Sequence, residues 1–354
     1  MTAPFIGRLS VVPSTVSALT LLALSLATAL AQDNSADAGV DLRGVELVIG
    51  IQTASSNANA ALVEASGVFK DTPYTLNWAQ FNGASAAVEA LQAGALDINI
   101  SLNYSTPAIN QANASVAWTL QDRPYVVVGA RRQPNVEIGV VVKPDSGIET
   151  MAGLAGKSAA FARGTVNHFF FALASEQAGL APNEIETVLL PIAEARAAFI
   201  GGSVDALVTS LYTARPLVSS GEGKVIADSK GLFETYQWVV VRPEILKDPA
   251  KEAAVADILL RLQQQSIWQS ENLDAVADIY ARESRQSAEE AIATARDTFS
   301  YVVPIDGKVI AENQRQIEIF HAAGVANTLV DGSIAFDTRF NNIVASAEAP
   351  TVIP

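Results

Sequence analysis

The sequence contains no cysteine, and His168 and His321 are its only histidines. Without cysteine the chain can form no disulfide bond, no thiol nucleophile and no cysteine-ligated zinc or iron–sulfur centre. Two histidines are too few for a multi-histidine metal site, and no EF-hand-like spacing of Asp and Gly occurs. We therefore expect neither a bound metal nor another cofactor.

Motifs of nucleotide-binding and hydrolytic enzymes are missing as well. The chain has no Gly-x-Ser-x-Gly nucleophile elbow, no P-loop and no Gly-x-Gly-x-x-Gly turn. A Ser–His–Asp triad would have to use His168, and no serine is evident that this histidine could activate. These absences predict a protein that is not an enzyme.

Positive charge is scarce. The 354 residues include 23 Lys and Arg against 37 Asp and Glu, for a formal net charge of −14. This balance argues against an electrostatic nucleic-acid surface, so we expect no nucleic-acid partner. A small anion is still an acceptable ligand, because the N–H groups at a helix start act locally whatever the net charge.

Long apolar runs are limited to the N-terminus. Arg8 precedes an apolar run over 16–26, and the small–x–small pattern at 29–31 is typical of a signal-peptidase site. We predict a cleaved signal peptide over 1–31, a flexible leader over 32–44 and a soluble periplasmic protein. The alternative is an uncleaved membrane anchor, which the shortness of the run disfavours.

From residue 45 onward, short β-rich runs alternate with helical patterns, which indicates a parallel α/β sheet. The expected strands are 45–52, 74–81, 96–101, 157–162, 185–190 and 204–210, and the expected helices between them are 57–69, 85–94, 165–179 and 193–202.

One βαβαβ unit occurs twice, because 87–100 can be laid over 195–208 without a gap. Asp97 and Asp205 occupy the same place in the two copies, each at the start of a strand. That position is at the opposite end of the strand from a ligand cleft, so we predict that both carboxylates have a structural role in capping turns.

The duplicated unit predicts two lobes of like architecture. The β-rich stretches 125–143 and 236–243 are expected to carry the chain from one lobe to the other and back, and helices from residue 248 onward are expected to pack on the first lobe. The resulting division is lobe 1 over 45–130 and 240–340, lobe 2 over 131–239, and a loose tail over 341–354.

Four expected strand ends carry clusters of Ser, Thr, Asn and Tyr, and each cluster opens a helix; they are 52–57, 101–106, 163–169 and 209–215. Ligands of parallel α/β sheets bind outside the carboxyl ends of the strands, where helix starts present free N–H groups. These clusters therefore predict an interlobe cleft for a small oxyanion. The alternative for each single Ser or Thr is a helix N-cap, but a cap does not need the neighbouring Tyr104, Tyr212, Arg163 and Arg215.

The order of these segments resembles the substrate-binding proteins of ABC importers for aliphatic sulfonates, taurine and nitrate. The residues that carry the resemblance are "IGIQ" (49–52), "NWAQFNGASAAVEALQAGALDINI" (77–100), "STPAINQANA" (105–114), "SGIETMAGLAGKSAAFARGTVNHF" (146–169), "AGLAPNEIETVLLPIAEARAAFIGGSVDAL" (178–207) and "YVVPIDGKVIAENQRQIEIF" (301–320). The resemblance implies an α/β periplasmic binding protein of type II. Each lobe would hold a βαβαβ-based sheet with flanking helices, and two crossing strands would form the hinge.

Two departures from the family pattern fall at the expected cleft. Where the sulfonate group usually has a Trp-Asp-Pro-Tyr-like turn, this chain has "TSLY" (209–212), and Asn103 and Tyr104 stand where a Gly is usual. By contrast, "RGTVNH" (163–168) keeps the Gly and His of a segment that holds the ligand oxyanion in the family. The family's enzymatic branch relies on a Cys-rich stretch, which is absent here.

We predict an extracytoplasmic receptor that captures a small organic oxyanion, with an aliphatic sulfonate or taurine-like compound as the leading candidate. It would act as a monomer and deliver its ligand to an ABC permease and its ATPase in the inner membrane. The alternatives are a receptor for a pyrimidine or other heteroaromatic compound, a sensor domain that presents ligand to a membrane receptor, and an enzyme of the same fold. The residues expected to contact the ligand are Gln52, Ser55, Ser56, Asn103, Tyr104, Ser105, Thr165, Asn167, His168, Ser210, Tyr212 and Trp238.

Overall fold

The computed structural model describes residues 40–52 and 58–354, so the expected signal peptide and most of the leader lie outside the described residues. The strands are β1 (Glu46–Gln52), β2 (Thr75–Phe81), β3 (Ile98–Leu102), β4 (Val126–Gln133), β5 (Ile138–Val142), β6 (Ser158–Phe161), β7 (Glu186–Leu189), β8 (Ala206–Ser210), β9 (Lys224–Asp228), β10 (Thr235–Val241) and β11 (Tyr301–Val303). The α-helices are α2 (Ala58–Ser66), α3 (Ala84–Gln92), α4 (Thr106–Ala112), α5 (Val166–Gln177), α6 (Ile192–Ile200), α7 (Leu211–Ser219), α8 (Pro249–Glu271), α9 (Leu273–Ser284), α10 (Ala288–Asp297), α11 (Gly307–Ala322) and α12 (Asn341–Ser346). Three 3-10 helices are η1 (Met151–Leu154), η2 (Pro243–Lys247) and η3 (Gly332–Ala335).

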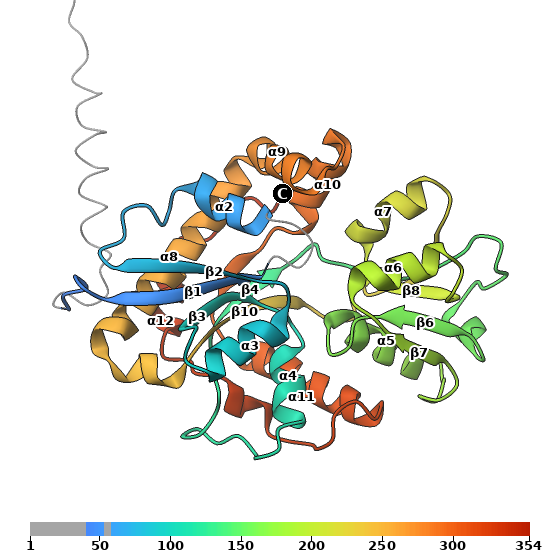
Figure 1. The fold of residues 1–354 in the computed structure, drawn as a ribbon, viewed down its shortest axis with the longest axis horizontal. Coiled ribbons are helices and arrows are strands. Elements are labelled where there is room, and N and C mark those ends of the chain that lie inside the picture. Colours follow the sequence, from blue (N-terminus) through green and yellow to red (C-terminus); the bar gives the residue numbers. More distant parts are fainter. Residues whose placement is uncertain (1–39, 53–57) are drawn as a thin grey trace, which may run out of the picture. The chain divides into compact units, whose positions relative to one another are not determined.

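These strands form two sheets, and Figure 1 draws β1, β2 and β3 of the first in blue to teal and β6 and β8 of the second in green to yellow-green. The first has the order β11-β4-β10-β3-β1-β2 and the second has the order β7-β6-β8-β5-β9. In both sheets the strands of the predicted βαβαβ unit pair in parallel, β1 with β2 and β3, and β6 with β7 and β8. An antiparallel strand then follows, β10 beside β3 and β5 beside β8. The two sheets therefore share one plan but are mixed, not purely parallel.

Asp97 and Asp205 hold equivalent places in the two sheets. Asp97 Oδ2 accepts the N–H of Val48 at 2.8 Å, and Asp205 Oδ2 accepts the N–H of Ser158 at 2.9 Å. Each carboxylate thus ties the start of its own strand to the parallel strand beside it, instead of capping a turn. Asp97 is also paired with Arg242. The role is structural, as predicted, although the bonded partner is a strand.

The chain passes between the sheets outside regular structure. The predicted crossing stretch 125–143 is two strands, because β4 belongs to the first sheet and β5 to the second. The crossings themselves are 134–137 and 229–234, and β10 rejoins the first sheet after the second of them. The division into lobes at the predicted boundaries remains a prediction.

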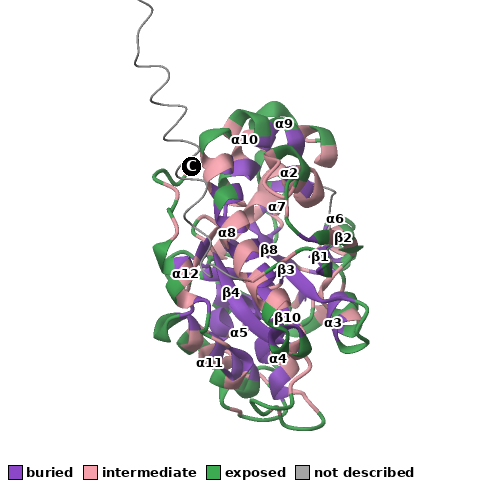
Figure 2. Cartoon of the chain, turned by 90° about the vertical axis from the view of Figure 1, so that its left-hand side faces the viewer, coloured by how far each residue is buried: buried purple, intermediate pink, exposed green. Residues whose placement is uncertain are grey.

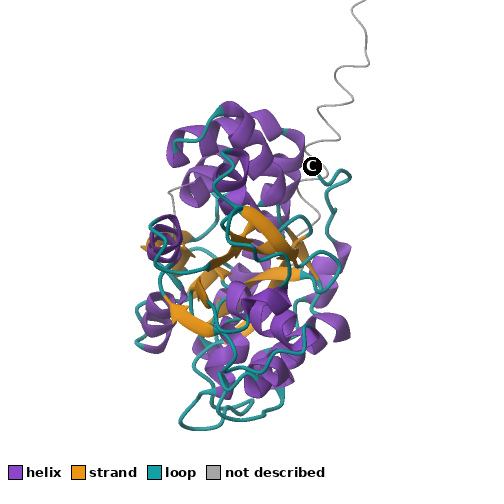
Figure 3. Ribbon diagram, turned by 90° about the vertical axis from the view of Figure 1, so that its right-hand side faces the viewer, coloured by secondary structure: helices purple, strands orange, loops and turns teal. Residues whose placement is uncertain are grey.

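Helices cover both faces of the first sheet, and Figure 3 shows the strands of the molecule lying between helices. On one face α3, α4 and α11 enclose an apolar cluster that includes Trp238 and Phe320, both completely buried. On the other face α8 supplies a second cluster with Ile258 and Leu259. Figure 2 shows the buried strands β4 and β10 between these layers.

The C-terminal stretch contains a helix where a loose tail was predicted. Phe340 and Val344 are buried against the first sheet, and residues 341–346 form α12. Burial of these two side chains fixes this segment of the backbone. None of the helices in the described ranges is long and apolar enough to cross a membrane.

Candidate ligand-binding site

The polar clusters of the sequence lie at strand ends that lead into helices. Gln52 ends β1, Asn103 and Ser105 connect β3 to α4, Thr165 precedes α5, and Ser210 ends β8. Ser55 and Ser56 lie outside the described residues. Because parallel strands end at one edge of a sheet, each sheet gathers its predicted residues along one edge.

Two polar side-chain atoms on the first sheet are buried and have no hydrogen-bond partner among the described residues. Gln52 donates its backbone N–H to Ser101 Oγ at 2.9 Å, but its side-chain Nε2 has no hydrogen-bond partner among the described residues. Ser105 is completely buried at the start of α4, and its Oγ likewise lacks a partner and makes no cap bond. The N-cap alternative therefore does not account for Ser105. Asn103 Oδ1 accepts the N–H of Ser105 at 3.3 Å and so holds this turn.

Tyr104 and Trp238 lie inside the molecule. The Tyr104 ring stacks on Trp238, with ring centroids 6.1 Å apart, and on Phe233. Trp238 Nε1 donates to the carbonyl oxygen of Tyr104 at 2.7 Å, and the Tyr104 hydroxyl donates to Glu312 at 3.2 Å. Burial raises the pKa of Tyr104 well above its usual value. In this structure both rings pack against each other inside the molecule and support the loop after β3. Their contact with a ligand stays a prediction.

The loop before α5 is organised by His168. Its Nδ1 accepts the N–H of Gly164 at 3.1 Å, so this helix-start N–H is not available to a ligand. Gly164 has a φ of +67°, and a Cβ there would come 3.4 Å from Ile109 of α4. Thr165 Oγ1 donates to the carbonyl of Ala162 at 2.8 Å. The neighbouring Asn167 is buried.

His168 is held in its neutral form. Burial, and then the charge of Arg163, lower the pKa of His168 to about 4. Its ring packs against Phe161 and Phe320, with centroids 4.9 Å and 5.4 Å away. A neutral imidazole whose Nδ1 accepts a hydrogen bond carries its hydrogen on Nε2. His168 can therefore donate one hydrogen bond but brings no positive charge to an anion.

The end of β8 is partly occupied by internal contacts. Ser210 Oγ lies 2.8 Å from Thr213 Oγ1, and Arg215, expected beside the cleft, forms an ion pair with Asp297 of α10. Burial raises the pKa of Tyr280 of α9 to about 12, and Tyr212, half-buried on the first turn of α7, lies close enough to raise it further. Tyr212 thus faces the helices that pack on the first sheet.

Arg131 is the charged residue that sequence reasoning missed. It lies on β4 with 7% of its surface exposed, and its Nη1 donates to the carbonyl of Ile100 at 3.3 Å. Its Nε lacks a hydrogen-bond partner, and no described carboxylate forms an ion pair with it. Burial lowers the pKa of Arg131 to about 10, and Tyr280 acts in the opposite direction. The sequence does contain one signal for this residue, because Arg131 and Arg132 stand together at the end of an apolar strand.

The contacts place Arg131 near the other unpaired groups. It reaches Ile100, the residue before Ser101, and Ser101 accepts the N–H of Gln52. β4 runs in the same direction as β3, because both pair antiparallel with β10. Arg131, Gln52 and Ser105 therefore lie at the carboxyl ends of three strands of one sheet. One buried guanidinium with neutral donors around it can hold a small anion.

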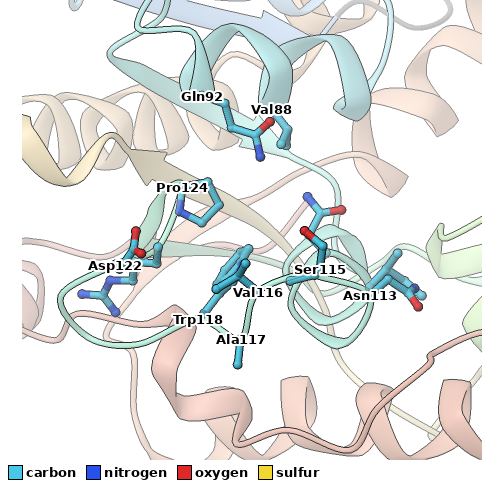
Figure 4. Close-up of a pocket in the computed structure, with 13 residues that line it drawn as sticks. Val88, Gln92, Asn113, Ser115, Val116, Ala117, Trp118, Asp122 and Pro124 are labelled. Carbon is cyan, nitrogen blue, oxygen red and sulfur yellow. The ribbon is translucent and has the colours of Figure 1, made fainter.

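The cavity in Figure 4 lies elsewhere, between the end of α4, the loop 113–124 and α3. It has a volume of about 500 Å³ and is lined by residues such as Val88, Gln92, Trp118 and Pro124, with none of the predicted ligand contacts among them. Among the residues that the structure describes, no three His, Asp or Glu side chains come together as metal ligands.

Comparisons with known proteins agree with this architecture. The NMT1/THI5-like family model matches residues 64–237. A protein of Escherichia coli (strain K12) named for aliphatic sulfonate binding is 29% identical over 198 residues, which are 54% of this chain and 59% of that protein. The chain thus spans less than two thirds of this relative. The taurine-binding periplasmic protein of Escherichia coli (strain K12) is 28% identical over 66% of this chain and 73% of its own length.

A solved structure shows the same fold. The alkanesulfonate-binding protein SsuA from Xanthomonas axonopodis pv. citri, bound to MOPS, superposes with a TM-score of 0.71 at 22% identity, over 83% of this chain and 99% of that one. The chain has the periplasmic binding protein fold, as the sequence predicted.

Proposed function

We propose that the chain is an extracytoplasmic solute-binding protein for a small organic sulfonate, because the NMT1/THI5-like family model matches residues 64–237. The observation that carries the ligand class is Arg131, a buried guanidinium without a carboxylate partner at the carboxyl ends of the strands. The relatives named for sulfonate and taurine binding support the same class.

An anion offsets an energetic cost in the ligand-free protein. A buried cation without a partner is unfavourable, since its lost hydration is not replaced. A sulfonate brings one negative charge and three acceptor oxygens to Arg131, Gln52 Nε2 and Ser105 Oγ. Hydrogen bonds to charged groups contribute about 1.5–3 kcal/mol each, so three or four of them reach the roughly 8 kcal/mol of a micromolar site.

The proposed setting is the periplasm, which the expected signal peptide over 1–31 would allow the chain to reach. The protein would capture its ligand by hinge closure, as a monomer and without chemical conversion, and pass it to a permease and an ATPase. The relatives named as binding proteins support this role. A neutral pyrimidine is the competing ligand, and it would leave Arg131 unpaired.

Calorimetric titration with ethanesulfonate, taurine, nitrate, acetate and a neutral pyrimidine tests the proposal. The sulfonates should bind, and Arg131→Gln should weaken their binding about 100-fold, because a buried charge contact is lost. The matched control is Arg132→Gln, since Arg132 is the adjacent residue and pairs with the partly exposed Glu234. This control should change affinity less than twofold. Sulfonate binding that is equally tight in Arg131→Gln, or binding of the pyrimidine alone, would refute the assignment.

A further inference from the structure

A second cavity lies between α5 and α11, and it is lined by His168 but not by Gln52, Ser105 or Arg131. It has a volume of about 400 Å³. Figures 1 and 2 show the two helices side by side. One wall is a face of α5 with residues such as His168, Phe171 and Ser175, and the facing wall includes Ile319 and Ala322 of α11. The cavity is therefore bounded by a helix of the second sheet and a helix of the first.

The chemistry of the walls restricts what could fill them. Most of the lining is apolar, with Phe171, Ile185, Ile319 and Val325 among its residues, and no Lys or Arg is part of it. Among the residues that the structure describes, the only charged one in the lining is Glu176, which is exposed. An anion would meet this carboxylate and no cation, so a sulfonate is a poor occupant. An uncharged, mostly apolar molecule suits these walls.

Two buried polar groups add a specific requirement. Ser175 is 9% exposed, and its Oγ has no hydrogen-bond partner among the described residues, although a buried hydroxyl normally has one. His168 is 6% exposed, and its Nδ1 is already bonded to Gly164. Nε2 is therefore the ring nitrogen left to donate. The two residues are seven positions apart on α5, and so lie on the same face of the helix.

We propose that this cavity is a second binding site, for a small uncharged molecule with an apolar body and one carbonyl or ether oxygen. The oxygen accepts hydrogen bonds from His168 and Ser175, and the apolar body fills the space between α5 and α11. The site is separate from the sulfonate site at the strand ends, and its occupant would touch elements packed on both sheets.

Photolabelling with benzophenone, a neutral aromatic ketone, tests the site directly. After irradiation, peptide mapping of the full chain should place the label in 168–182 and 319–325. Ala172→Trp fills the cavity from α5 and should reduce this labelling at least about tenfold, in line with loss of the site. Gln177→Trp adds the same side chain to an exposed position of α5 and should leave the labelling unchanged. Labelling outside these segments, or equal labelling of Ala172→Trp, would overturn the proposal.

Ser175→Val provides a second measurement that does not depend on filling the cavity. In the parent protein, acetophenone should compete with benzophenone at lower concentration than ethylbenzene, which has no oxygen, by about fivefold for one hydrogen bond. Ser175→Val should remove much of this preference. An unchanged preference in a folded variant would show that Ser175 does not contact the ligand oxygen. None of these measurements involves a sulfonate, so their failure is distinct from failure of the proposed function.

Discussion

At the scale of single residues, the structure buries two basic side chains in opposite states. Arg131 is charged and has no acidic partner, whereas His168 is neutral and packed between Phe161 and Phe320. A buried charge without a partner is ready to bind an anion, and a buried neutral imidazole resists protonation. Under the proposed function, Arg131 therefore responds to ligand, whereas His168 responds to pH.

The lowered pKa of His168 predicts that the folded protein loses stability in acid. Its pKa is lowered from 6.5 to about 4 in the folded protein, so between these values the unfolded chain binds a proton that the folded protein does not. Stability is complete above pH 6.5 and falls as the pH falls toward 4, by on the order of 3 kcal/mol from this residue. Urea unfolding of the parent and of His168→Gln at pH 7.5, 5.5 and 4.5 measures this loss of stability. The parent should lose more stability than the variant, and equal losses would contradict the prediction.

The place of a residue at a strand end can be predicted from the sequence where the local order of residues decides it. Gln52 ends β1 and Ser105 follows β3, as predicted, and their contact with a ligand stays a prediction. Arg131 was missed because its environment comes from Ile100 and from Tyr280, which are distant in the sequence. The pairing of Arg215 with Asp297 was hidden for the same reason.

At the scale of elements, β4 and α8 pack closely through a glycine. A Cβ on Gly129 would lie 2.5 Å from Leu259 Cδ2 and 3.2 Å from Val239 Cβ. The missing side chain lets the long helix α8 lie directly on the strand. The sequence predicted both elements, but the contact between them depends on a register that periodicity does not reveal.

Gly129→Ala should therefore destabilise the protein by about 1–3 kcal/mol, because the added methyl group overpacks this contact. Gly307→Ala is the matched control, since Gly307 begins α11 and no atom lies within 4 Å of a Cβ there. The control should be neutral or slightly stabilising. Thermal unfolding of both variants measures the difference, and equal midpoints would show that α8 can shift away from β4.

Prediction of elements was most accurate where local signals were strong. The helix α10 (Ala288–Asp297) lies in the region from residue 248 onward where helices were predicted, and Ser287 and Glu290 make a capping box at its start. The strand β9 was not predicted, because it lies at a sheet edge with four residues half-buried and Asp228 exposed, and it carries little apolar pattern. The helix α12 was not predicted either, because it is held by burial of Phe340 and Val344.

At the scale of the whole molecule, side-chain contacts link the two halves besides the two chain crossings. Arg215 on α7 pairs with Asp297 on α10, and Arg315 of α11 donates to the carbonyl of Leu232 at 2.8 Å. These polar links are partly exposed, and a buried aromatic contact between His168 of α5 and Phe320 of α11 joins the same two halves. Under the proposed function, the Arg215–Asp297 pair favours the closed arrangement before ligand arrives.

Asp297→Asn should loosen this arrangement. We expect a larger radius of gyration of the ligand-free protein in X-ray scattering, and sulfonate binding about two- to threefold weaker, since a partly exposed ion pair contributes little. Glu149→Gln serves as control. It breaks the exposed ion pair between Glu149 and Lys224, which both belong to the half that contains the second sheet. It should change neither quantity. If Asp297→Asn matches the parent in both, the pair does not influence closure.

The sheet order also has a consequence for the sequence of events during synthesis and export. The strands of the second sheet are contiguous in the chain, from Ile138 to Asp228. The first sheet begins earlier but needs β10 and β11, which end at Val241 and Val303. In a chain that emerges from its N-terminus, the half that starts second can be completed first. The strands β3 and β4 of the first sheet then keep unpaired edges until β10 and β11 have been synthesised.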